Sequence, residues 1–453
     1  MNQAGKLPFR TLARNGAAAG VIKLASAGLT FLLFVAAALA TDERQFGLFS
    51  TAYAGASLVS FFSLVGQHAV VLRFWPQYGD GRKRAVANGL MARAIAVTLA
   101  GLAVSTLLVL AIGLVPFALT RVPEWQALAP AAAALTFALG WSEFTACAFR
   151  AKNRLFSGLL PRDIVWRVLT AAAFAGSGSL TGGISAVAAT WLSAALLLLC
   201  VLPQSFVLLK ETLCAPRGPL TLAQRAEFRA VTLGLWGVTA LPPALSQAST
   251  LLVAAILGPE AAGAIFVADR IMRLAVLALS GINQALAPQI SGSFHRGDRE
   301  HVQRIVAITA IAGFTLALAT LVVFVLFGRP ILALFDPAYA TGTMHMVLIV
   351  LGLGALVGTA CGPTELLMQL TGLQQALFRT LVGVNTLGLC ATAVLTAATG
   401  AIGAAFGMAG TMALWCVIGA GIARSRIGID PSILGFLAGQ DADAVRAILK
   451  GRP

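Results

Sequence analysis

The amino-acid sequence predicts an all-α integral membrane protein with about twelve transmembrane helices in two six-helix lobes. Three observations predict this fold class: an apolar composition, regularly recurring apolar segments, and basic residues confined to alternate loops. Of the 453 residues, 58% are hydrophobic and 11% are charged, and the mean hydropathy is +0.87. Soluble domains carry about 25% charged residues, so the composition excludes an ordinary soluble enzyme.

The predicted spans follow from length, because a helix needs about 20 apolar residues to cross the hydrocarbon core. Charged and turn-forming residues separate the apolar segments, as in TDERQ, YGDGRKR, GSGSLTGG and LGPEAAG. The predicted lobes are 1–209 and 229–426, with a linker at 210–228 and a tail at 427–453. In chain order, the spans are 15–40, 46–71, 87–114, 125–148, 158–178, 183–208, 230–256, 261–286, 304–327, 343–369, 375–398 and 401–423.

The basic residues predict the orientation of the chain. Nearly all of them fall on one side of the alternating loops, and only Arg44, Arg121 and Arg329 fall on the other. By the positive-inside rule, both termini and the linker are cytoplasmic. The formal net charge of +15 is then explained by topology and by attraction to anionic lipid, so we expect no nucleic-acid partner.

The two predicted lobes carry similar sequences. The segment FVAAALATDERQFGLFSTA at 34–52 parallels LLVAAILGPEAAGAIFVA at 251–268, about 217 residues later. Both copies begin on the same side of the membrane, so the repeat is parallel and predicts a pseudo-two-fold axis along the membrane normal. In folds of this kind the substrate site lies between the two bundles, and rocking of the bundles gives alternating access.

A group of charged residues interrupts the eighth span. Arg270 lies near the middle of the apolar segment 257–286, with Asp269 beside it and Arg273 one helical turn further on. An ionised side chain at this depth costs roughly 2.5–3.5 kcal/mol on insertion scales, so it normally lines a wet cavity or meets a buried partner. The group indicates a polar path through the helix bundle, used by a negatively charged substrate.

Four further basic residues are candidate ligands for an anionic substrate. Lys23 lies in span one, Arg93 in span three and Arg167 in span five, while Arg73 ends span two. Three of them have an alternative interpretation: Arg93 is able to snorkel to the interface, and Arg73 is able to mark the interface itself. Arg167 lies four residues after Asp163, so an ion pair within one helix also explains it.

Carboxylates and prolines within the spans suggest moving parts. Glu143 and Glu365 occupy equivalent spans four and ten, and together with Asp269 they are candidates for gating or ion coupling. Pro242 and Pro243 lie at mid-depth in span seven, where they remove backbone donors and kink the helix. A hinge and a static kink remain equally open for this pair.

The remaining polar residues show no pattern of a catalytic, metal or cofactor site. The six cysteines are scattered without a CxxC pair, and the four histidines lack metal-ligand spacing. Gly352, Gly354 and Gly358 in span ten have the spacing of close helix contacts. We therefore expect no catalytic residues, no metal and no cofactor.

Several stretches resemble the polysaccharide transporter family of the multidrug/oligosaccharidyl-lipid/polysaccharide exporter superfamily. They are the hairpins LGPEAAGAIFVADRIMRL and DERQFGLFS, the stretch SLVGQHAVVLRFWPQYGD after span two, and FRAKNRLFSGLLPRDIVWRVL across spans four and five. The resemblance covers nearly the whole chain. It implies a two-lobed, twelve-helix fold with a cationic central cavity.

The family includes the Wzx-type flippases, which move lipid-linked oligosaccharides across the bacterial inner membrane. The resemblance therefore implies a multi-pass inner-membrane protein whose substrate is a polyprenyl diphosphate-linked oligosaccharide and whose surroundings are the lipid bilayer. Candidate protein partners are a polysaccharide polymerase and its chain-length machinery. No covalent chemistry is expected, so the protein is not expected to be an enzyme.

Three alternatives stay open at this point. A cation-coupled multidrug antiporter of the same superfamily shares the fold, although such exporters typically bury an acid in the first helix, where this chain has Lys23. A lipid II flippase also has a cationic cavity, but it has about fourteen spans. A membrane glycosyltransferase or polymerase needs a large outer loop, and the first outer loop, with Asp42 and Glu43, is too short for an active site.

Overall fold

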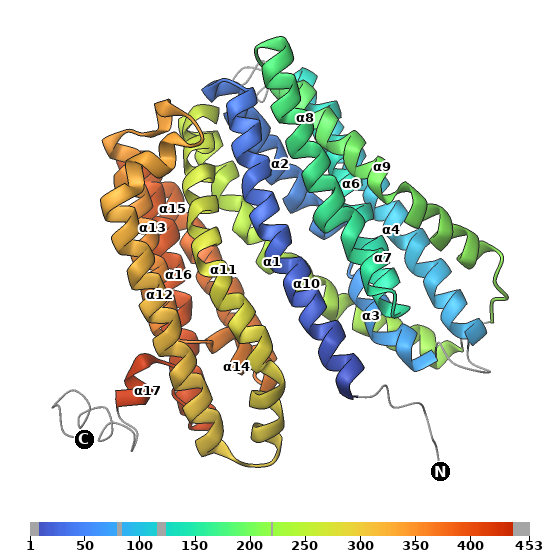
Figure 1. Ribbon diagram of the computed structural model, residues 1–453. Coiled ribbons are helices and arrows are strands. Elements are labelled where there is room, and N and C mark those ends of the chain that lie inside the picture. The colour runs from blue at the N-terminus through green and yellow to red at the C-terminus, as the bar shows by residue number, and fades with distance from the viewer. Residues whose placement is uncertain (1–8, 79–83, 116–123, 219–220, 438–453) are drawn as a thin grey trace. The chain divides into compact units, whose positions relative to one another are not determined.

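Helices account for all the regular structure of the residues described by the computed structural model, which are 9–78, 84–115, 124–218 and 221–437 (Figure 1). Within these ranges each of the twelve predicted spans falls on one helix or on a run of helices interrupted by a short break. The predicted all-α membrane fold is therefore confirmed. The end of the predicted tail, 438–453, lies outside the described residues.

Contacts along the chain divide it into two units, Met1–Gly263 and Ala264–Pro453. The helices of the first unit are α1 (Phe9–Ala40), α2 (Glu43–Ser63), α3 (Gln67–Tyr78), α4 (Arg84–Gly113), α6 (Trp125–Ala151), α7 (Leu155–Leu160), η2 (Pro161–Val165), α8 (Trp166–Thr181), α9 (Ala186–Leu213) and α10 (Leu222–Leu257). Helix α11 (Pro259–His295) begins at the end of this unit and continues into the second.

The second unit contains the remaining helices. They are α12 (Arg299–Ala333), η3 (Pro337–Tyr339), α13 (Gly342–Ala360), α14 (Thr364–Leu370), α15 (Gln374–Thr399), α16 (Ala401–Ile427) and α17 (Ile433–Leu437).

Length and hydropathy identify most of the predicted spans again. Among the described residues, nine helices are long and apolar enough to cross a bilayer, and the bent α10 makes a tenth. The two predicted spans outside this group are 158–178 and 261–286. These two spans contain the charged residues around Asp163 and Asp269. Their charge makes them less apolar than the helices that meet the length and hydropathy criteria.

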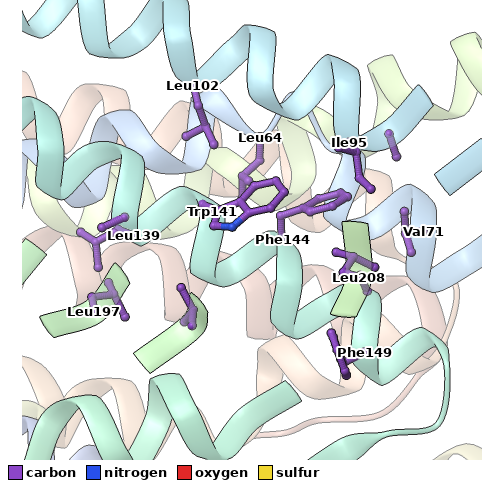
Figure 2. Packing of buried hydrophobic residues seen from close by; sticks show 14 of the residues in the cluster. Leu64, Val71, Ile95, Leu102, Leu139, Trp141, Phe144, Phe149, Leu197 and Leu208 are labelled. Carbon is purple, nitrogen blue, oxygen red and sulfur yellow. The ribbon is translucent and has the colours of Figure 1, made fainter. Parts of the chain in front are cut away.

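Helix α6 forms the centre of the first unit. It packs against α2, α3, α4, α7 and α9, and its many alanines allow these neighbours to approach closely. Figure 2 shows Trp141 and Phe144 of α6 at the middle of the buried cluster, with their rings stacked at 5.7 Å. The Trp141 indole nitrogen donates to Ser205 Oγ of α9 at 2.8 Å, which satisfies its polar end within the core.

Two breaks interrupt helices of the first unit. Between α2 and α3, Val65 and Gly66 have φ values of 46° and 69°. A Cβ at Gly66 would lie 3.0 Å from the backbone nitrogen of Trp236 in α10, so the left-handed conformation and the close contact both favour glycine there. The second break is η2, a π-helical turn that begins at Pro161, whose missing N–H removes an α-helical hydrogen bond.

Helix α10 packs along the first unit. Its residues contact α2 and α3, and the Trp236 indole nitrogen donates to the Phe62 carbonyl of α2 at 3.0 Å. The segment before it is also docked, since Gly218 N donates to the Ala85 carbonyl of α4 at 2.9 Å. The predicted linker 210–228 is thus held against α4 at this point, while the predicted boundaries of the lobes remain predictions.

Glycines bring the helices of the second unit together. Gly354 of α13 faces Ala409 of α16, where an added Cβ would lie 2.7 Å from the Ala409 Cα. Helices α15 and α16 use reciprocal pairs, in which Gly388 faces Thr411 and Gly407 faces Thr392. The predicted packing role of the span-ten glycines is confirmed, because Gly352 and Gly358 also meet neighbouring side chains.

We expect Gly407→Ala to lower the stability of the protein. The new Cβ would lie 2.5 Å from the Thr392 Cα, a backbone contact that forces α15 and α16 apart at a cost of about 1–3 kcal/mol. Gly410→Ala on the same helix is the matched control, because no atom lies within 4 Å of its Cβ position. Alanine there should stabilise the helix by about 0.5–1 kcal/mol. Thermal unfolding in detergent should show opposite shifts, and equal shifts would contradict the packing argument.

Candidate functional site

Five charged side chains come together in the first unit. We call this group the N-terminal charge cluster, and it consists of Lys23, Glu143, Arg162, Asp163 and Arg167. They come from α1, α6, η2 and α8, and Figure 1 shows α1 running beside α8. Three cations face two carboxylates, so the cluster carries one excess positive charge.

Asp163 is the centre of the cluster. Its side chain is only 2% exposed, and it accepts from Lys23 Nζ at 2.9 Å and from Arg167 Nη1 at 3.1 Å. The Lys23 contact joins helices that are far apart in the sequence, whereas the Arg167 contact spans one helical turn. The ion pair predicted from the spacing of Asp163 and Arg167 is therefore confirmed. A second cation, Lys23, shares the same carboxylate.

The guanidinium of Arg167 is held by the protein itself. Besides Asp163, it donates to Thr30 Oγ1 of α1 at 2.7 Å and to the Arg162 carbonyl at 2.9 Å, and it lies over the Trp166 ring. Its side chain is only 12% exposed. Since most of its donors are used, Arg167 serves mainly to fix α8 against α1.

The π-helical turn directs two neighbouring side chains to different helices. Arg162 forms an ion pair with Glu143 of α6, while Asp163 turns to Lys23 of α1. Successive residues of a helix point in directions about 100° apart, so one turn is able to serve both partners. Trp166 fixes the end of the turn, because it is fully buried and donates to the Ser193 carbonyl of α9 at 3.0 Å. Turns of this kind occur frequently at functional sites.

Arg162 is the member of the cluster that the sequence analysis did not include. Its place next to a proline at the start of a predicted span is typical of a residue in a cytoplasmic loop. The one signal in the sequence is Asp163 beside it, because a carboxylate at the start of an apolar span needs a partner.

Lys23 is the cation of the cluster that remains accessible. Its side chain is 47% exposed, and its ammonium has three donors, one of which binds Asp163. An anion approaching α1 would therefore meet Lys23 before the buried arginines. Among the predicted ligands in the first unit, the geometry favours Lys23 over Arg167.

The charged residues of α11 form a second group. Arg273 Nε donates to Asp269 at 2.6 Å, and the Asp269 side chain is 6% exposed against 42% for Arg273. Arg270 is half-buried, and its guanidinium carbon lies 4.4 Å from the centre of the Phe266 ring. The structure thus joins Asp269 to Arg273. It also places Arg270 in a cation–π contact with Phe266, which lies one helical turn earlier in α11.

The other predicted site residues lie outside these two groups. Arg93 and Arg73 are exposed, and Arg73 lies over the ring of its neighbour Phe74. Glu365 is also exposed and accepts from Gln369 at 3.0 Å. The place of Arg73 near the end of α3 agrees with its interfacial interpretation, whereas Arg93 is the tenth residue of α4 and its interpretation stays a prediction.

Helix α10 bends where the prolines occur. The segments Leu235–Leu241 and Pro243–Leu257 make an angle of 43°. The predicted kink at Pro242 and Pro243 is therefore confirmed, while movement about it stays a prediction. Proline causes such a bend because it removes an intrahelical hydrogen bond and its ring displaces the preceding turn.

Comparisons with known proteins agree with this architecture. Residues 238–361 match the MatE family model. The chain is similar to a multidrug resistance MATE family transporter of the MOP superfamily solved in an inward-facing conformation, with 14% identity, a TM-score of 0.73, and coverage of 92% of this chain and 98% of that one. No curated protein sequence matches the chain.

The chain is also similar to two further solved structures, each at 16% identity, and each match covers 92% of this chain and 96% of the other. The outward-facing form of a multidrug resistance MATE family transporter gives a TM-score of 0.61. A MOP superfamily transporter from Pyrococcus furiosus, described as having a binding pocket of reverse polarity that suggests a different function, gives 0.56. The chain is thus a multi-pass membrane protein with a MatE region at residues 238–361 and the fold of MATE-family transporters of the MOP superfamily.

Proposed function

We propose that this protein transports a polyprenyl diphosphate-linked oligosaccharide across the bacterial inner membrane by alternating access. The observation that carries the proposal is Lys23, a half-exposed cation in the first helix that belongs to a cluster with excess positive charge. The substrate couples an anionic head to a long apolar tail. A hydrated, positive site suits the head, while the tail stays in lipid.

The chemistry of the diphosphate favours a lysine at this position. A lysine ammonium is a compact charge on a flexible stem, so it is able to follow a phosphate as the protein changes conformation. Arg270 and Arg273 on α11 carry guanidinium groups, which are bidentate donors of the kind that bind phosphate. On this proposal, the polysaccharide polymerase and its chain-length machinery are the candidate partners, because they use the glycan after it crosses the membrane.

A multidrug antiporter is the second candidate, and the structural comparisons favour it. The similar structures include transporters described as multidrug resistance MATE proteins. Asp163 and Glu143 are also carboxylates inside the first unit, as a site for cations would require. Both are paired with basic side chains, however, and their cluster remains positive. The Pyrococcus furiosus transporter described as having reverse pocket polarity supports the idea that pocket charge varies within this fold.

The short turn between α1 and α2, on the predicted outer side, argues against a glycosyltransferase. Only Thr41 and Asp42 separate the two helices, and the Asp42 side chain accepts from Gln45 N at 2.7 Å as a helix cap. A helix cap satisfies an otherwise free backbone donor. The Asp42–Glu43 pair thus has a structural explanation that requires no catalytic role.

A transport assay with both substrate classes tests the proposal directly. The purified protein is placed in liposomes with a short polyprenyl diphosphate oligosaccharide, and transfer is read by a lectin outside. Parallel liposomes contain a fluorescent cationic drug. We expect lipid transfer above protein-free liposomes and no drug movement, and drug movement without lipid transfer would overturn the proposal in favour of the antiporter.

Arg270→Ala should abolish transfer of the lipid-linked oligosaccharide, because it removes a cation from the middle of a predicted span. Arg270→Lys should retain part of the activity, since the charge survives although bidentate contact with phosphate is lost. The measurement is surface polysaccharide in a deletion strain complemented by each variant, at matched membrane expression. Full export by Arg270→Ala would remove this residue from the site.

Lys23 and Arg167 should respond differently to substitution by methionine. Lys23→Met should abolish transport with little change in thermal stability, because the lysine is half-exposed and Asp163 keeps Arg167. Arg167→Met removes a buried group with several hydrogen bonds, and breaking a buried pair costs about 3–5 kcal/mol. Unfolding in detergent and transport in liposomes separate the two effects. A large loss of stability in Lys23→Met would assign it a structural role instead.

A further inference from the structure

Three helix beginnings meet around Arg44 in the first unit. The Arg44 guanidinium donates from Nε and Nη2 to both carboxylate oxygens of Glu124, at 3.0 and 3.2 Å, and from Nη1 to Glu260 Oε1 at 2.8 Å. Arg44 is the second residue of α2, Glu124 precedes α6, and Glu260 is the second residue of α11. We call these three side chains the outer clasp, because the positive-inside rule predicts that this end faces away from the cytoplasm.

The backbone beneath the outer clasp is also in close contact. A Cβ at Gly47 of α2 would overlap the carbonyl of Pro259, the first residue of α11. About two turns further along α2, Gly55 faces Leu251 of α10, with its added Cβ at an ordinary van der Waals distance of 3.6 Å. The turn between α10 and α11 therefore rests directly on α2, and the outer clasp lies over this contact.

The outer clasp lies near the start of α11, the helix of Arg270, and close along the chain to the end of α1, the helix of Lys23. Arg44 is the fourth residue after the end of α1. Glu260 lies ten residues before Arg270 on α11, a distance of about 15 Å along the helix. The two sides of the clasp also belong to the two copies of the repeat at 34–52 and 251–268.

We propose that the outer clasp is a reversible latch, which closes the outer end of the transport path and breaks in each transport cycle. Arg44 is one of three basic residues on the predicted outer side, so its specific pairing explains an exception to the charge bias. Its exposure suits a latch: the side chains of Arg44, Glu124 and Glu260 are 42%, 35% and 38% exposed. Partly exposed ion pairs are weak enough to open reversibly. The bidentate contact between Arg44 and Glu124 makes the closed arrangement geometrically specific.

The proposal depends on alternating access and not on the identity of the substrate. A latch of this kind serves a flippase and an antiporter equally. Its test therefore measures opening of the outer end without any substrate, so that failure of the latch and failure of the proposed substrate are separate results.

Accessibility of a buried cysteine below the clasp provides the test. Ser50 lies in α2 one and a half turns after Arg44 and is fully buried, so Ser50→Cys is a conservative reporter. A membrane-impermeant maleimide is added to intact cells, and labelling is measured above that of the parent chain. We expect slow labelling of the reporter alone and about fivefold faster labelling when Arg44→Ala is added.

Charge exchange and a matched control complete the experiment. The exchange Arg44→Glu with Glu260→Arg should restore slow labelling, whereas Arg44→Glu alone should label fast. Arg154→Ala is the control, because Arg154 also pairs with a glutamate, Glu211, on the predicted cytoplasmic side. It should leave labelling unchanged. Labelling that stays slow in Arg44→Ala, or fast labelling that the exchange does not reverse, would overturn the latch.

Discussion

The cost of an unpaired charge within a bilayer is the constraint on which this structure depends. Backbone polar groups are satisfied within helices, but an ionised side chain at that depth must find a partner or water. In the first unit Asp163 meets this requirement for two cations, and Glu143 meets it for Arg162. The positions of α1, α6 and α8 are therefore tied together by charge as well as by apolar packing.

The π-helical turn is the local device that makes this pairing possible. The π-helical turn changes the directions in which the Arg162 and Asp163 side chains point, compared with a regular α-helix through Pro161. In these directions Arg162 reaches Glu143 of α6 and Asp163 reaches Lys23 of α1. The buried indole of Trp166 holds the end of the turn in place through its bond to α9. Apolar packing and polar geometry thus act on the same few residues, so a substitution in this turn affects both.

The sequence predicts the helices of this protein better than its site. Apolar length and loop charge are local signals, and the twelve spans predicted from them all fall on helices. The break at Gly66 leaves little local signal, because it depends on the approach of Trp236 from a helix far along the chain. Pairing of Lys23 with Asp163 likewise joins residues 140 positions apart, and no periodicity encodes such a contact. Arg162 resembles a loop residue in the sequence, because it follows Pro161 near the start of a predicted span.

Under the proposed function, the pairing of Lys23 with Asp163 has a consequence for transport. A carrier must release its substrate, and a site with several free cations would hold a diphosphate too firmly. Asp163 is an internal competitor for Lys23, so an incoming phosphate gains only the difference between two charge-assisted contacts. Arg167 keeps Asp163 neutralised while Lys23 exchanges partners. The cluster is then able to bind an anion on one side of the membrane and lose it on the other, without leaving a carboxylate buried and unpaired.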